Sequence, residues 1–305
     1  MIRFLQRKEI DIEKWNSCIQ QSPNGQIFVF SWYLDICCEG WCGLVEDDYQ
    51  SVFPLAIRKK VGISYLYQPF FTRHFGVFST LNISKELQLE FLSAIPPHLK
   101  FWDFCMNREC KEITADIYAE KKTYQTLSLN TTYSAIRDRY NENLRRNLKK
   151  SATEEYICIF DFSPEKVVEQ FHHLQKDKLK AFSEDDYLTL KNLMNGVTRN
   201  ADYKCIAVQN KKKEIVAGAF FMNSHNRIVY LKGFSNEEGK KNGAMHFLFD
   251  QLIKQEAGST AILDFGGSSV ESVARFYKSL GANDSVYLHL HKNRLPKILR
   301  WIKRR

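Results

Sequence analysis

The fold of the second half of the chain depends on one stretch, Asp264-Phe265-Gly266-Gly267-Ser268-Ser269-Val270-Glu271. The residues before it, from Ala261 to Phe265, form a short apolar run that predicts a buried strand. Two glycines follow, and they allow a sharp turn or a close approach of the backbone to a ligand. Ser268 and Glu271 have the spacing of a capping box, so a helix is expected to begin there. Apolar residues then recur at helical spacing up to Gly281, which is placed to end the helix in the left-handed conformation.

Length and composition indicate an ordinary globular protein with a local excess of positive charge. The chain has 305 residues, 44% hydrophobic and 26% charged, enough for two domains with cores of their own. The net charge of +9 is concentrated in residues 292–305 and in residues 137–150. Such charge favours anionic partners, namely phosphates, nucleic acid or a membrane surface, but a solvated helix face is an equally good explanation for residues 292–305.

No signal peptide and no apolar run long enough to cross a bilayer are visible, so a cytoplasmic location is expected. The eight cysteines lack the paired spacing of zinc ligands, and we expect no metal site.

Residues 1–130 read as one α/β unit. Strands are expected at 41–45, 51–59 and 101–106, and a helix is expected after Ser84. The loop 68–76 places Arg73 and His74 among three phenylalanines, where they could bind substrate. The alternative, which the pattern favours, is that the phenylalanines fill a core and the two polar residues lie at its rim.

Residues 131–305 read as a second unit. A basic helix is expected at 134–152, and its Arg145 and Arg146 are candidates for binding a phosphate-bearing donor; the alternative is a linker helix with solvated charges. Two helices, at 164–181 and 184–198, precede three strands in an antiparallel meander. A loop at 235–242 then leads into a helix that begins at Gly243.

This order of elements resembles the GNAT acyltransferase superfamily. Lys240-Lys241-Asn242-Gly243-Ala244 is similar to the family's loop, whose backbone amides and helix N-terminus hold the donor's pyrophosphate, although Met245 replaces a usual small residue. Residues 274–282 resemble the helix whose tyrosine protonates the leaving thiolate. The resemblance therefore implies that Tyr277 is a general acid, and the alternative is a core aromatic residue.

The stretch from Asp264 to Gly267, together with residues 144–150, resembles the Fem-like branch of that superfamily. The resemblance implies two packed GNAT-like modules in an α/β (α+β) chain, each a mixed, largely antiparallel sheet flanked by helices. The best-known members move amino acids from aminoacyl-tRNA onto peptidoglycan precursors. The helical-hairpin insertion of some members is absent here.

The transfer chemistry needs an amine held against an acyl carbon. Asp264 is a candidate for orienting or deprotonating the amine, or it is a turn residue that satisfies the amides of Gly266 and Gly267. Lys232, on the strand before the donor loop, contacts an anionic substrate or is a surface residue.

We therefore expect an N-acyltransferase that uses acetyl-CoA or acyl-CoA as co-substrate and transfers the acyl group to a small-molecule or cell-wall-precursor amine. One alternative is an aminoacyl-tRNA-dependent transferase acting on a peptidoglycan precursor. The other is a non-catalytic module that binds a polyanion or a membrane surface.

Overall fold

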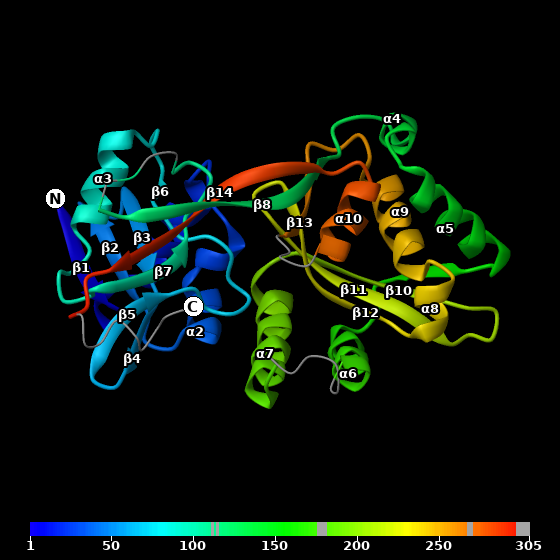
Figure 1. Ribbon diagram of the computed structural model, residues 1–305, viewed down its shortest axis with the longest axis horizontal. Coiled ribbons are helices and arrows are strands. Elements are labelled where there is room, and N and C mark those ends of the chain that lie inside the picture. Colours follow the sequence, from blue (N-terminus) through cyan, green and yellow to red (C-terminus); the bar gives the residue numbers. More distant parts are fainter. Residues whose placement is uncertain (111–112, 114–115, 176–181, 267–270, 297–305) are drawn as a thin grey trace. The chain divides into compact units, whose positions relative to one another are not determined.

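The computed structural model describes residues 1–110, 113, 116–175, 182–266 and 271–296, and the chain divides into two compact units (Figure 1). The first unit contains Met1–Lys122 and the chain from Val286 onward, and the second contains Thr123–Ser285. The mixed α/β class expected from the sequence is confirmed. The division into modules at residue 130 stays a prediction, and the grouping of the last strand with the first unit was not anticipated.

The first unit is built around two groups of strands. One group is a four-stranded sheet in the order β1-β2-β3-β6, and the other has the order β4-β5-β7-β14. Its strands are β1 (Ile2–Gln6), β2 (Cys42–Glu46), β3 (Ser51–Leu55), β4 (Ile57–Lys60), β5 (Ile63–Tyr67), β6 (Phe78–Ser79), β7 (Phe101–Cys105) and the end of β14 (Asn283–Asn293); its helices are α1 (Ile12–Gln21), α2 (Ser31–Cys37) and α3 (Lys85–Ser93).

Local side-chain chemistry sets where the helices of the first unit begin. Asp11 accepts a hydrogen bond from the backbone of Lys14 at the start of α1, and Ser84 accepts one from Leu87 at the start of α3. Trp15 of α1 is fully buried, its ring 4.8 Å from that of Trp41. Burial of large aromatic side chains of this kind contributes about 1.5–3 kcal/mol each.

The second unit has one sheet in the order β8-β13-β12-β11-β10-β9. The predicted meander is confirmed, because β10, β11 and β12 pair antiparallel in sequence. Its strands are the end of β8 (Tyr118–Ser128), β9 (Ile157–Phe160), β10 (Tyr203–Gln209), β11 (Ile215–Ser224), β12 (Arg227–Ser235) and β13 (Ile262–Gly266); its helices are α4 (Tyr133–Asp138), α5 (Glu142–Thr153), α6 (Pro164–Gln175), α7 (Glu184–Asn200), α8 (Glu237–Lys241), α9 (Ala244–Glu256) and α10 (Glu271–Ser279).

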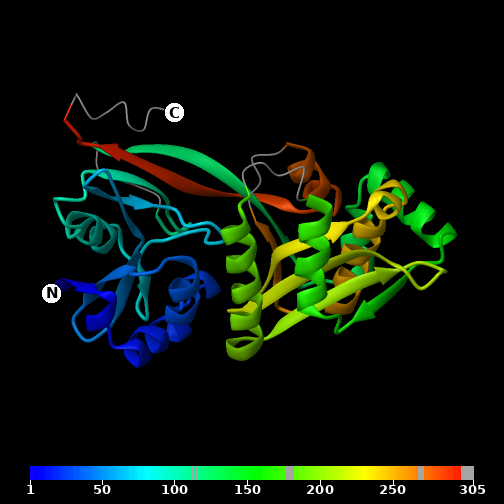
Figure 2. The same ribbon diagram turned by 90° about the horizontal axis from the view of Figure 1, so that it is seen from below.

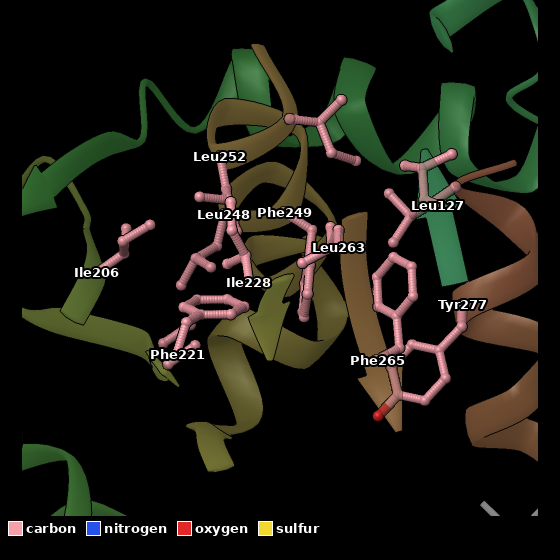
Figure 3. Close-up of a cluster of buried hydrophobic side chains, with 14 of the residues drawn as sticks. Leu127, Ile206, Phe221, Ile228, Leu248, Phe249, Leu252, Leu263, Phe265 and Tyr277 are labelled. Atoms are coloured by element: carbon pink, nitrogen blue, oxygen red, sulfur yellow. The ribbon is translucent and has the colours of Figure 1, made fainter. Parts of the chain in front are cut away.

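Helices cover both faces of this second sheet. Figures 1 and 2 show α6 and α7 on one face of the strands, whereas α9 and α10 lie on the other. The core under α9 joins side chains from nine elements of this unit, which are β8, α4, α5, β10, β11, β12, α9, β13 and α10 (Figure 3). Among them, Phe221 of β11, Phe249 of α9 and Leu263 of β13 are almost completely buried.

Three expectations about local structure were wrong. The strand expected at 51–59 is two strands, because Ala56 separates β3 and β4, which join different groups of strands. The single helix expected at 134–152 is interrupted after α4, and Asn141 caps a new helix by accepting from the backbone of Leu144 at 2.9 Å. The loop expected at 235–242 contains α8, capped by Asn236.

Other expectations fall outside the described residues. The capping role of Ser268, the turn at Gly267, the end of the helix at 176–181 and the basic segment 297–305 all lie there. In the described residues, no helix is long and apolar enough to cross a membrane.

Candidate functional site

The candidate site of the second unit lies where two parallel strands separate. β12 and β13 pair only from Arg227–Ile262 to Val229–Asp264. Directly after this point the pairing of β12 with β11 shifts by one residue, which places a bulge at Leu231. In the described part of the chain, β12 therefore continues to Ser235 with β11 on one side and no strand on the other. We call the region formed by residues 229–235 and 264–266 the strand junction.

Asp264 lies at the apex of the strand junction and is only 5% exposed. Its Oδ1 accepts a hydrogen bond from the backbone N–H of Gly266 at 2.9 Å, and its Oδ2 lies 3.3 Å from the guanidinium of Arg227. Gly266 has φ of 74°, a conformation that favours glycine, so the turn and the carboxylate support each other. Both carboxylate oxygens have partners, which favours the structural role of Asp264; its catalytic role stays a prediction.

Tyr277 extends from α10 into the aromatic side of the strand junction and is 6% exposed. Its ring stacks on Phe265 with centroids 4.8 Å apart, and it lies 6.4 Å from the ring of Tyr230 (Figure 3). Burial raises the pKa of the Tyr230 hydroxyl well above its ordinary value, and Tyr277 adds to that shift. The hydroxyl of Tyr230 is therefore not ionised at neutral pH.

Gly243 forms the expected glycine turn at the start of α9. It has φ of 76°, and a Cβ at this position would lie 2.9 Å from the Cβ of Asn147 on α5. The hydroxyl of Ser151 on α5 lies 2.9 Å from the carbonyl oxygen of Asn242. The loop before α9 is thus held against α5, and Ala244 is buried as the first residue of α9.

The basic residues near this turn are exposed. Lys240 pairs with Glu237 at 2.7 Å on the surface, and Lys241 is exposed beside it. On α5, Arg146 is exposed and Arg145 donates to the carbonyl oxygen of Asp138 at 3.0 Å. Asn147 of α5 lies against Gly243, so α5 passes close to the N-terminus of α9, where the helix dipole favours an anion.

Lys232 lies on the other face of the sheet from Tyr277. Its Nζ is 4.6 Å from the ring centre of Phe171 on α6 and 5.1 Å from that of Phe182. Burial lowers the pKa of the Lys232 ammonium. The side chain is therefore a half-buried cation held by aromatic rings rather than a freely solvated surface residue.

His246, in the first turn of α9, was not identified from the sequence. Its ring packs against Phe276 with centroids 4.7 Å apart, and burial lowers its pKa to about 4. His246 is therefore neutral at physiological pH and joins the start of α9 to α10. A single histidine inside a helix gives no signal in the sequence that could have revealed this contact.

Arg73 and His74 belong to the first unit and not to the strand junction of the second. The guanidinium of Arg73 lies 5.3 Å from the ring centre of Phe28. His74 is 5% exposed, and its ring lies 4.6 Å from that of Tyr287. The alternative from the sequence is met only in part, because Phe75 is buried but Phe70 is 54% exposed, and His74 is itself buried rather than at a rim. A role in substrate binding stays a prediction for Arg73 and His74.

A second cluster that the sequence did not predict lies in the first unit. His289 and His291 of β14 approach Asp103 of β7, and the three potential ligand atoms lie within 4.8 Å of one another. The two histidines are two residues apart on one strand, so they share a face, but the sequence gives no indication that Asp103 pairs with them.

Comparisons with known proteins identify the fold through structure alone. No protein-family model and no curated protein matches the sequence. The crystal structure of FemX matches with a TM-score of 0.65 at 13% identity, over 94% of this chain and 96% of that chain. L-PGS from Bacillus licheniformis matches with a TM-score of 0.57 at 15% identity, over 96% of this chain and 95% of that one.

An acetyltransferase of the GNAT family from Colwellia psychrerythraea matches with a TM-score of 0.50 at 10% identity, over 96% of this chain and all of that chain. Identities this low bear on the fold only. The chain has a GNAT/Fem-like fold along almost its whole length.

Proposed function

We propose that the protein is an acyltransferase that moves an acyl or aminoacyl group onto an amine at the strand junction. The observation that carries this proposal is the separation of β12 and β13 after Val229 and Asp264. It leaves one side of the later part of β12 without a neighbouring strand in the described residues, next to the start of α9 and the buried Tyr277. A GNAT/Fem-like fold along the chain supports the same class of reaction.

The donor is proposed to bind along the unpaired side of β12. An extended arm with amide groups can pair with an exposed strand edge as an added strand would. Its phosphates would then meet the N-terminus of α9 after Gly243, where amides and the helix dipole favour negative charge. Lys240, Lys241 and Arg146 add positive charge around this point.

Transfer proceeds by direct attack in this proposal. The amine nitrogen forms a bond to the acyl carbon, and the bond from that carbon to the donor's sulfur breaks. The departing thiolate takes a proton from the hydroxyl of Tyr277, and the new amide nitrogen loses its extra proton to solvent. The ring contacts of Tyr277 with Phe265 and Tyr230, both of the strand junction, support this role.

The donor is proposed to be a CoA thioester, with aminoacyl-tRNA as the second candidate. The CoA thioester is preferred because it is a compact donor, and its few phosphates need only the few basic residues near Gly243. The second candidate is supported by the likeness to FemX and by the exposed basic residues of α5, which would contribute a salt-dependent contact with a longer polyanion.

The test compares thermal unfolding of the full chain with acetyl-CoA, a longer acyl-CoA and aminoacyl-tRNA. Binding at 100 times the Kd adds about 2.7 kcal/mol of stability, so a CoA ester is expected to raise the unfolding midpoint clearly. The double variant Lys241→Glu/Arg146→Glu is expected to weaken this effect at least tenfold in ligand concentration. Lys254→Glu, an exposed charge reversal near the other end of α9, is the matched control and is expected to bind as the wild type does.

Each other outcome rejects part of the proposal. Stabilisation by aminoacyl-tRNA alone, falling steeply with salt, would replace the CoA donor with the second candidate. Stabilisation by simple polyanions with no response to either donor would reject acyl transfer and support the non-catalytic binding module.

A further inference from the structure

The face shared by β7 and β14 in the first unit carries two imidazoles and a carboxylate that converge. The Nε2 of His289 lies 2.8 Å from the Oδ1 of Asp103, and the Nδ1 of His291 lies 3.3 Å from the same oxygen. The two rings are 4.2 Å apart. Three groups that can each bind a metal thus point at one small region.

Strand geometry explains why these groups converge. Asp103 and His291 are direct partners in the antiparallel register, and His289 is two residues away on β14. Side chains two residues apart on a strand lie on one face, and directly opposed residues have neighbouring Cβ atoms. The ladder between β7 and β14 therefore fixes all three side chains, as a preformed site requires.

The separations fit a metal of the zinc type. Zinc binds imidazole nitrogen and carboxylate oxygen at about 2.0–2.2 Å, so two ligands of a tetrahedral ion lie roughly 3.4 Å apart. The three ligand atoms here lie between 2.8 Å and 4.8 Å from one another. Small rotations of the side chains would bring them to this spacing without any movement of the strands.

The surroundings of the three groups leave room for water. The side chain of His289 is 10% exposed, whereas those of Asp103 and His291 are 22% and 27% exposed. Three protein ligands with one side open to solvent are the arrangement of a zinc ion that keeps a water molecule as its fourth ligand.

We propose that Asp103, His289 and His291 bind one divalent metal ion of the zinc type. The ion would connect β7 to β14 through Asp103 and His289, which are 186 positions apart in the sequence. It would thereby fasten the C-terminal end of β14 to the first unit. The spacing of the cysteines predicted no metal site, and this site uses none of them.

The test measures binding of Zn²⁺ and of Co²⁺ to the full chain, prepared without a histidine tag and treated with a chelator. Calorimetry is expected to give one ion per chain, and Co²⁺ is expected to give visible absorption bands typical of tetrahedral coordination. His291→Ala and Asp103→Asn are each expected to weaken binding more than about 100-fold, because the loss of an outer-shell partner alone costs 10–100-fold. His98→Ala, an exposed histidine of the same unit, is expected to bind as the wild type does.

Two controls keep the test decisive. Asp103→Asn has the shape of the native residue, and His289→Gln keeps a donor for Asp103, so both variants are expected to fold, which circular dichroism of the metal-free chains checks. Absence of one-to-one binding of either ion would overturn the proposal. So would wild-type affinity in both His291→Ala and His289→Gln, because the ion would then lie elsewhere.

Discussion

Asp264 in the second unit and Asp103 in the first occupy corresponding places in two similarly built sets of strands. In the second unit, β12 pairs parallel with β13, and β13 pairs antiparallel with β8. In the first unit, β5 pairs parallel with β7, and β7 pairs antiparallel with β14. Each aspartate is the third residue of its strand and is followed by a phenylalanine.

The partners of the two aspartates differ, and so do their chemical possibilities. Asp264 faces the guanidinium of Arg227, which is permanently charged and cannot bind a metal. Asp103 faces His289 and His291, which can each offer a lone pair. The same strand position therefore gives a closed ion pair in one unit and a ligand set in the other.

The largest effect is expected from a variant that breaks the buried ion pair between Asp264 and Arg227 in the second unit. Arg227→Ala removes the guanidinium that faces the buried carboxylate of Asp264, and breaking such a pair costs about 3–5 kcal/mol. We expect the free energy of unfolding of the second unit, measured with a denaturant, to fall by about 3 kcal/mol. Arg275→Ala, which removes an exposed pair at 3.9 Å, is the control and is expected to change it by less than about 0.5 kcal/mol. Equal losses of unfolding free energy in the two variants would mean that the buried pair contributes no more stability than the exposed pair.

The next prediction concerns activity, and it tests whether the second unit alone supplies the proton donor of the reaction. Tyr277→Phe removes the proposed proton donor and keeps the ring that stacks on Phe265, so kcat is expected to fall about 100-fold or more. Tyr287→Phe makes the same change beside His74 in the first unit and is expected to leave kcat unchanged. Turnover unchanged in a folded Tyr277→Phe protein would remove Tyr277 as the acid.

The smallest effect compares two glycines with the same backbone conformation. Gly243 and Gly62 both have φ of 76°, but a Cβ at Gly243 would meet Asn147 at 2.9 Å, whereas none of the described atoms lies within 4 Å at Gly62. Gly62→Ala is expected to cost about 1 kcal/mol from backbone strain, and Gly243→Ala about 2 kcal/mol from strain and crowding together. Thermal unfolding of the two variants measures the difference, and equal losses would show that α5 does not hold the loop tightly.

Much of the fold of the second unit could be predicted because its signals are local. The meander, the glycine turn before α9 and the left-handed Gly281 depend on residues that are close in sequence, and each is present. The break between α4 and α5 was missed because apolar spacing continued across it, although Asn141 is a good helix cap.

The site was predicted less completely because its geometry depends on distant partners. Two roles of equal weight were open for Asp264 from its sequence context, and the position of Arg227 favours the structural one. It treated Lys232 as a surface or substrate-binding residue, whereas two aromatic rings hold it. Pairing across strands and burial under a helix are properties that no short stretch contains.

The stretch from Asp264 to Gly281 thus determined by itself that a strand, a turn at Gly266 and a helix carrying Tyr277 follow one another, because these elements form from local apolar spacing and glycine conformation. Only the tertiary structure decided which groups face the two aspartates. The reason is that strand register, set by pairing over the whole sheet, brings Arg227 to Asp264 and His291 to Asp103.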